Sequence, residues 1–148
     1  ARSFLVRRAL TPTARLAAGQ ALSRMRPAPA AIDISDGLLR DLRHILERSS
    51  VGAEIDTDAI PLSPAYRAAM RGDLELALGG GEDYELLFCL RHRYSEAELT
   101  RKLAVPAHRI GTIVRGRPAV VLKGRTGRQP MPSVAGWDQL RNEIAEGG

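Results

Sequence analysis

Residues 30–46, AAIDISDGLLRDLRHIL, begin with the pattern of a strand and change directly to the pattern of a helix. Apolar residues alternate over residues 30–35, which predicts a short strand. From Ser35 or Asp36 onward, apolar residues recur at helical spacing, which predicts an amphipathic helix that ends near residues 49–50. Its apolar stripe consists of Leu38, Leu39, Leu42, Ile45 and Leu46. This segment predicts a fold in which a strand leads directly into a helix.

The other patterns also mix helices and strands, without the regular order of repeated βαβ units. Three further helices are predicted, with Thr11, Ser63 and Ser95 as their N-caps. The last stretch of strand pattern predicts a hairpin that turns around residues 115–118. The predicted strand segments are residues 52–60, residues 82–90 and the hairpin at residues 108–123. This order favours an α+β fold with helices packed on a mixed sheet.

The composition narrows the class of protein. With 148 residues, the chain is long enough for one domain with a substantial core. No apolar run approaches the roughly 18 residues that cross a bilayer, so no membrane segment is predicted. Cys89 is the only cysteine, which excludes an internal disulfide and a cysteine-based zinc site. The cytoplasm is the expected compartment.

The net charge of +5 raises the question of nucleic-acid binding. The positive charge comes almost entirely from arginine, since Lys102 and Lys123 are the only lysines. The arginines are scattered along the chain, and aromatic residues that could stack on bases make up 4% of it. The pattern therefore favours arginine-rich coding over a nucleic-acid-binding surface, and no nucleic-acid partner is expected.

The sequence DISDG places two carboxylates and a hydroxyl at the joint between strand and helix. Asp33 and Ser35 share one face of a strand, and Asp36 lies at the corner, where the helix N-terminus points its N–H groups. Two nearby carboxylates repel each other unless a cation lies between them, and Mg²⁺ commonly takes one or two protein carboxylates together with phosphate oxygens. A magnesium-bound phosphate is therefore predicted here. The alternative is that Ser35 or Asp36 only caps the helix, which would leave Asp33 unexplained.

A second group of residues combines Gly79–Gly81 with Glu82, Asp83 and Tyr84, just before a predicted strand. Consecutive glycines permit unusual backbone angles and close approach of a ligand. The segment is neither a Walker A loop nor a dinucleotide-binding fingerprint, because no Gly-Lys-Ser/Thr follows and the strand comes after the glycines. The alternative is a flexible turn with solvated acids.

The segments IDISDGLLRDLRHI, GAEIDTDAIPLSP, LALGGGEDYELLF and RIGTI, followed by a late Gly-Trp, together resemble the thiamine-monophosphate kinases. The resemblance runs from about residue 8 to residue 140. It implies transfer of the ATP γ-phosphoryl group to thiamine monophosphate, giving thiamine diphosphate, with Mg²⁺ required. It also implies an α/β/α layered domain that is partly ferredoxin-like. DISDG alone is also similar to related ATP-using enzymes with an aminoimidazole-ribonucleotide-synthetase type of fold.

The resemblance also assigns roles to individual residues. Asp33 and Asp36 would each bind magnesium, and Ser35 would contact the nucleotide. Glu82 would contact the thiamine substrate, and Trp137 occupies the position of a substrate-contacting aromatic residue. No residue resembles a nucleophile or a necessary general base, so direct in-line transfer is expected.

The resemblance covers only the C-terminal half of the family's enzyme. Residues 1–29 are then expected to form an N-terminal helix and linker of the same domain, and residues 30–148 the ligand-binding domain. The family's N-terminal half, which binds ATP and magnesium and forms the homodimer, would be absent, so this chain alone is expected to be inactive. The alternatives are a non-catalytic domain that binds nucleotide or thiamine phosphate, and a related ATP-dependent enzyme of purine metabolism.

Overall fold

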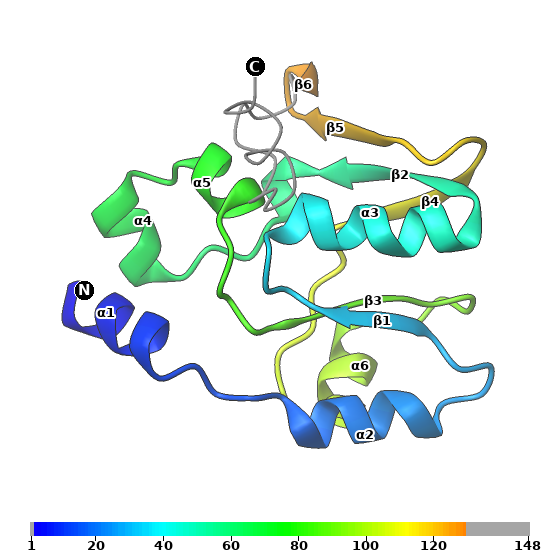
Figure 1. The fold of residues 1–148 in the computed structure, drawn as a ribbon, viewed down its shortest axis with the longest axis horizontal. Coiled ribbons are helices and arrows are strands. Elements are labelled where there is room, and N and C mark those ends of the chain that lie inside the picture. The colour runs from blue at the N-terminus through cyan, green and yellow to red at the C-terminus, as the bar shows by residue number, and fades with distance from the viewer. Residues whose placement is uncertain (1, 130–148) are drawn as a thin grey trace, which may run out of the picture.

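A computed structural model describes residues 2–129 of the chain (Figure 1). Helices and strands alternate irregularly along it. The helices are α1 (Arg2–Leu10), α2 (Leu16–Arg24), α3 (Leu38–Ser49), α4 (Pro64–Met70), α5 (Leu74–Gly79) and α6 (Glu96–Leu103), with a 3₁₀ turn η1 (Thr57–Ala59). The strands are β1 (Ala30–Asp33), β2 (Val51–Asp56), β3 (Leu86–Cys89), β4 (Gly111–Arg115), β5 (Val120–Gly124) and β6 (Gly127–Gln129). No helix among residues 2–129 is long and apolar enough to span a membrane.

The strands form two sheets with helix α3 between them (Figure 1). The smaller sheet is the antiparallel pair β1–β3, and the larger has the order β4-β2-β5-β6. Within the larger sheet β2 is antiparallel to β4 and parallel to β5, so this sheet is mixed. Helices α2 and α6 pack against each other and lie on the far side of β1–β3 from α3 (Figure 1). The predicted α+β fold with a mixed sheet is therefore confirmed.

The core consists of two hydrophobic clusters, one on each face of the β1–β3 pair. In the first, the apolar stripe of α3 packs against alternate residues of β2, including Ala53 and Ile55. Leu42 and Leu46 of α3 are among the most completely buried side chains in the described part of the chain. The second cluster contains the buried residues of α2 and α6, with Leu86 and Phe88 of β3 packed against them, while Leu87 belongs to the first. Burial on both faces explains why β3 reads as a continuous apolar run.

The predicted caps at Ser63 and Ser95 are confirmed. The Ser63 hydroxyl accepts a hydrogen bond from the backbone N–H of Tyr66 at the start of α4. Ser95 and Glu98 form a reciprocal capping box at the start of α6. These caps depend on residues within one helical turn, which is why the sequence alone shows them.

The predicted N-cap at Thr11 is wrong. Helix α1 already ends at Leu10, and the Thr11 hydroxyl donates a hydrogen bond to the backbone oxygen of Arg7. Thr11 therefore follows the end of α1, and α2 begins only at Leu16. A threonine followed by a proline is found both just after one helix and just before the next. The local pattern therefore could not show which helix boundary Thr11 marks.

The predicted hairpin over residues 108–123 is also wrong, because β2 lies between its two arms. Strands β4 and β5 each pair with β2 and not with one another. Their short connection crosses the start of β2 at Gly52, where an added Cβ would lie 3.2 Å from the Ala119 carbonyl oxygen and 3.3 Å from that of Arg117. The missing side chain at Gly52 thus gives the connection room to pass over β2.

Candidate functional site

The DISDG segment and the GGED segment lie side by side and are joined through their backbones. The N–H of Glu82 donates to the carbonyl oxygen of Ser35 at 2.8 Å, and the N–H of Tyr84 donates to that of Ile34 at 2.8 Å. The N–H of Ile34 in turn donates to the carbonyl oxygen of Glu85 at 2.8 Å. These bonds continue the β1–β3 ladder, so two motifs far apart in the sequence form one structural unit.

Two glycines allow this close approach. An ideal Cβ on Gly81 would overlap the carbonyl oxygen of Ser35 and would lie 3.3 Å from the Cα of Asp36. Gly37 has a φ of 115°, and an ideal Cβ there would lie 2.7 Å from the carbonyl oxygen of Gly79. In each contact a glycine meets main-chain atoms of the other segment, so neither position can accept a side chain without a movement of the main chain. The glycines of both motifs are therefore required by the packing of one segment on the other.

The buried side chain of Asp41 holds the DISDG turn by accepting hydrogen bonds from its backbone. Asp41 is 2% exposed, and its Oδ2 accepts the backbone N–H of Ser35 at 3.0 Å and that of Asp36 at 3.1 Å. Asp41 was not among the site residues predicted from the sequence. The available signal was its spacing, since Asp41 lies three residues after Leu38 and therefore on the buried face of an amphipathic helix. A charged residue at such a position needs a specific partner.

We expect Asp41→Ala to lower the free energy of unfolding by about 1–3 kcal/mol, because two partly buried N–H groups would lose their acceptor. Urea denaturation measures the effect. The matched control is Glu47→Ala on the exposed face of the same helix, which removes only an exposed ion pair with Arg43. Its expected effect is within about 0.5 kcal/mol. Equal stabilities of the two variants would contradict the role given to Asp41.

The structure rules out the reading in which Ser35 or Asp36 only caps the helix. Helix α3 begins after Gly37, which is its N-cap residue and provides no side-chain hydrogen bond. Asp33, the last residue of β1, is exposed and pairs in register with Leu86, while Ser35 is half-buried. The side chain of Asp36 is 48% exposed, and its Oδ2 lies 3.6 Å from Nε of Arg40. These oxygens therefore remain at the surface of the joint and do not serve to cap α3.

The turn formed by Glu82, Asp83 and Tyr84 has an unusual backbone. Glu82 and Tyr84 have φ values of 70° and 52°, in the left-handed region that residues other than glycine rarely adopt. All three are exposed as whole residues, while the Asp83 carboxylate itself is partly shielded from water. Loss of water around its carboxylate, with a smaller contribution from the negative charge of Glu85, raises the pKa of Asp83, while Arg8 opposes the shift. Strained backbone of this kind concentrates at functional sites.

The expected metal ligands supply the right kind of atom for a hard cation. Asp33 and Asp36 offer carboxylate oxygens, which Mg²⁺ prefers, and Mg²⁺ usually completes its shell with water and phosphate oxygens. Nη1 of Arg40, the residue that pairs with Asp36, is buried and has no hydrogen-bond partner within residues 2–129. This corner of the site thus has a spare donor for an anionic oxygen. Over the same residues, no group of three or more His, Cys, Asp or Glu residues is placed to hold a metal.

The site residues predicted from the sequence are thus only partly brought together. The backbones of Ser35 and Glu82 are hydrogen-bonded, and Asp33 and Asp36 belong to the same joint. Trp137 lies outside the described residues.

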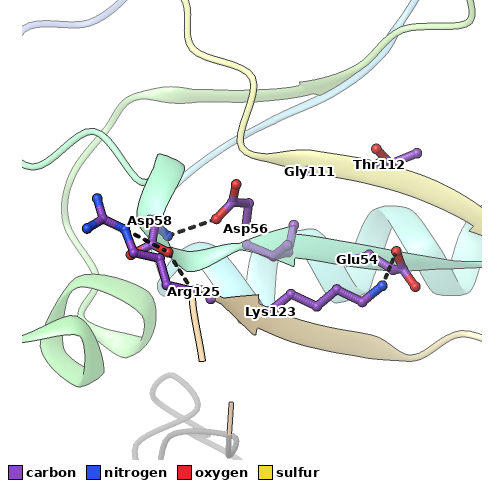
Figure 2. Close-up of a pocket in the computed structure, with 9 residues that line it drawn as sticks. Glu54, Asp56, Asp58, Gly111, Thr112, Lys123 and Arg125 are labelled. Atoms are coloured by element: carbon purple, nitrogen blue, oxygen red, sulfur yellow. Dashed lines mark hydrogen bonds and ion pairs between the residues drawn. The ribbon is translucent and has the colours of Figure 1, made fainter. Parts of the chain in front are cut away.

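A separate cavity of about 400 Å³ is lined by residues of the adjacent strands β4, β2 and β5 and of the turns that follow β2 and β5 (Figure 2). Two of its acids pair with basic side chains: Lys123 Nζ lies 2.8 Å from Glu54 Oε2, and Arg125 Nε lies 3.9 Å from Asp58 Oδ2. The Arg125 backbone N–H also donates to Asp58 Oδ2 at 2.8 Å. Asp56 Oδ1 accepts the backbone N–H of Asp58 at 3.0 Å. The three acidic side chains that line this cavity each have a partner within it, as Asp36 of the DISDG joint has in Arg40.

Comparison with known proteins places the chain in a family. Residues 4–123 match the family model described as AIR synthase related protein, C-terminal domain. The thiamine-monophosphate kinase of Haemophilus influenzae is 47% identical over 114 residues, which are 74% of this chain and 34% of that protein. The chain thus spans about a third of the length of this curated relative.

Solved structures agree. The thiamine monophosphate kinase of Aquifex aeolicus matches with a TM-score of 0.65 and 32% identity, over 86% of this chain and 41% of that one. AaThiL complexed with AMPPCP and TMP matches with a TM-score of 0.64 and 32% identity, over 78% of this chain and 37% of that one. Sequence and structure are both similar to thiamine-monophosphate kinases, and the chain belongs to the AIR synthase related family, as a C-terminal domain.

Proposed function

We propose that this chain forms the ligand-binding, C-terminal domain of an ATP-dependent thiamine-monophosphate kinase. The reaction would transfer the γ-phosphoryl group of ATP to the phosphate of thiamine monophosphate, giving thiamine diphosphate and ADP. The observation that carries the proposal is the direct backbone pairing of DISDG with GGED. It is supported by 47% identity to the kinase from Haemophilus influenzae and by the similar AaThiL structure complexed with AMPPCP and TMP.

The proposed roles of the residues follow from their chemistry and position. Asp33 and Asp36 would hold magnesium, which when bound neutralises negative charge on the phosphates. Ser35, whose backbone is fixed by Asp41 and Glu82, would contact the nucleotide. Glu82 is exposed on the strained turn and would attract the cationic thiamine. Trp137 would stack on the thiamine ring, as an indole can on a cationic ligand.

The chain's own contribution to catalysis is then orientation and binding. Phosphoryl transfer needs aligned reactants and compensation of charge more than covalent participation by the protein. The exposed carboxylates at the joint repel a free phosphate, so they favour phosphates only when a cation accompanies them. No nucleophilic side chain is assigned, and direct in-line transfer is proposed. The remainder of the family's polypeptide would complete the site and form the homodimer, in the cytoplasm.

Calorimetry on the natural polypeptide tests the binding part of this proposal. Binding of the ATP analogue AMPPCP should require Mg²⁺ and should disappear with EDTA, while thiamine monophosphate should bind to the same protein. Binding of AMPPCP that is unchanged by EDTA would contradict the metal site. Binding of both ligands without any turnover would instead support a non-catalytic binding domain.

A further inference from the structure

The carboxylate of Glu85, beside the site, accepts hydrogen bonds from two arginines in the N-terminal part of the chain. Arg15 donates from Nε to Glu85 Oε2 at 2.8 Å and from Nη2 to Oε1 at 2.6 Å. Arg8, on α1, donates from Nη2 to the same Oε1 at 2.7 Å. The Arg15 contact is bidentate, a geometry that fixes direction as well as distance. We call Arg8, Arg15 and Glu85 the arginine clamp.

The clamped residue is also a fixed point for the site backbone. The carbonyl oxygen of Glu85 accepts the N–H of Ile34, and the preceding residue, Tyr84, donates its N–H to the carbonyl oxygen of the same Ile34. Glu85 therefore anchors the strained turn at residues 82–84 on its C-terminal side, while Gly81 packs on Ser35 at the other side. The side chain of Glu85 ties this anchor to α1 and to the linker before α2.

The clamp differs from the exposed Arg43–Glu47 pair in burial and geometry. The side chains of Arg8 and Arg15 are 31% and 27% exposed, and that of Glu85 is 41% exposed. In the Arg43–Glu47 pair the values are 74% and 49%. Exposed single pairs contribute little, whereas two arginines on one carboxylate form a small network that can hold a definite geometry. The hydrogen bond to Glu85 raises the pKa of Arg15 against the opposing effect of burial, as expected for a close pair.

The charges of the turn also need such a partner. Glu82, Asp83 and Glu85 place three acids within four residues. Without compensation, their mutual repulsion favours an open turn with the carboxylates apart. Arg8 acts on two of them, because it pairs with Glu85 and also favours the ionised form of Asp83. The clamp thus neutralises Glu85 and leaves Glu82 and Asp83 as the exposed acids of the turn.

We propose that Arg8 and Arg15 are positioning residues. By holding Glu85, they hold the turn at residues 82–84 in the shape that presents Glu82 to the substrate, so that substrate affinity depends on the N-terminal helix and linker. This inference rests on the proposed function for the identity of the substrate. The clamp itself acts on the backbone and can be tested without any ligand.

The first test is hydrogen exchange of the natural polypeptide, measured by mass spectrometry. In Arg15→Gln, the amides of Glu82 and Tyr84 should exchange about tenfold faster, because the turn opens more often. Arg15→Lys keeps the positive charge but cannot form the bidentate contact, so these amides should exchange at an intermediate rate. The matched control Arg43→Gln should leave the turn at the wild-type rate. Helix α6 should be unchanged in every variant.

Two results would overturn the positioning role. One is a wild-type exchange rate at Glu82 and Tyr84 in Arg15→Gln. The other is equal acceleration in the turn and in α6, which would mean that the clamp stabilises the whole domain and not the turn. Arg15→Lys keeps this comparison possible if Arg15→Gln unfolds.

The second test separates the clamp from the proposed function. In a kinase assay, Arg15→Gln should raise KM for thiamine monophosphate about tenfold and leave kcat and KM for ATP within about twofold. An active wild-type protein with an unchanged KM in Arg15→Gln would overturn the clamp and leave the proposed function standing. An inactive wild-type protein would count against the proposed function, and the exchange experiment would still decide the clamp.

Discussion

Asp36→Asn is expected to reduce magnesium-dependent phosphoryl transfer by about 100-fold or more, with the fold intact. The amide keeps the size of the side chain and removes the negative charge that would attract the cation. The side chain is 48% exposed and caps no helix, so little stability should be lost. The measurement is the rate of thiamine diphosphate formation by the natural polypeptide at saturating ATP and Mg²⁺, together with the thermal unfolding midpoint.

Two controls show whether Asp36→Asn loses activity because it no longer binds magnesium. Arg40→Gln removes the ion pair with Asp36 but leaves the carboxylate, so it should retain magnesium dependence. Asp56→Asn makes the same chemical change at an exposed carboxylate on the other sheet and should retain full activity. Undiminished activity of Asp36→Asn, with wild-type dependence on Mg²⁺ concentration, would remove Asp36 from the metal site.

Gly81→Ala is expected to lower the free energy of unfolding by about 3 kcal/mol and to abolish ligand binding. The new Cβ would overlap the Ser35 carbonyl oxygen and press on the Cα of Asp36. Both are main-chain atoms, so the strain cannot be relieved by a change of rotamer. The chain must move apart, which breaks the 2.8 Å hydrogen bond between Glu82 and Ser35. Denaturant unfolding and calorimetry with AMPPCP measure the two effects.

Gly19→Ala is the matched control for this substitution. Gly19 lies inside α2, where an added Cβ would meet only the Cδ1 of Leu86, at an ordinary 3.9 Å. Alanine favours a helix interior, so this variant should gain about 0.5–1 kcal/mol. If Gly81→Ala were as stable as the wild type and still bound AMPPCP, the two motifs could not be packed as described.

Local signals in the sequence predicted much of this fold. The apolar stripe of α3 is visible because its period follows from helix geometry alone. The caps at Ser63 and Ser95 are visible because donor and acceptor lie within one turn. The DISDG carboxylates are also visible locally, since two acids and a hydroxyl lie within four residues where the strand pattern changes to the helix pattern.

Contacts between distant segments could not be predicted in the same way. The insertion of β2 between β4 and β5 depends on Gly52 lying beneath a connection far along the chain. The arginine clamp joins Glu85 to two residues far earlier in the chain, because Arg8 precedes it by 77 positions and Arg15 by 70. Helical periodicity and strand alternation describe neighbours, and they contain no information about which remote side chain completes a pair.

The candidate site was predictable in its residue types but not in its support. Asp33, Ser35, Asp36 and Glu82 were singled out from the sequence, and their roles as ligands remain predictions. The spacing of Asp41 indicates a place on the apolar face of α3, but only the structure shows that its partners are two amides of the DISDG turn. Residues that shape a site thus needed the structure, whereas residues that could bind a ligand were visible from their chemistry.

The most direct measurement is the formation of thiamine diphosphate by the natural polypeptide supplied with ATP, Mg²⁺ and thiamine monophosphate. The proposed function predicts equal amounts of thiamine diphosphate and ADP, and no product after Mg²⁺ is removed with EDTA. Failure to form thiamine diphosphate, by a folded protein that still binds AMPPCP with Mg²⁺, would contradict the assignment to thiamine-monophosphate phosphorylation.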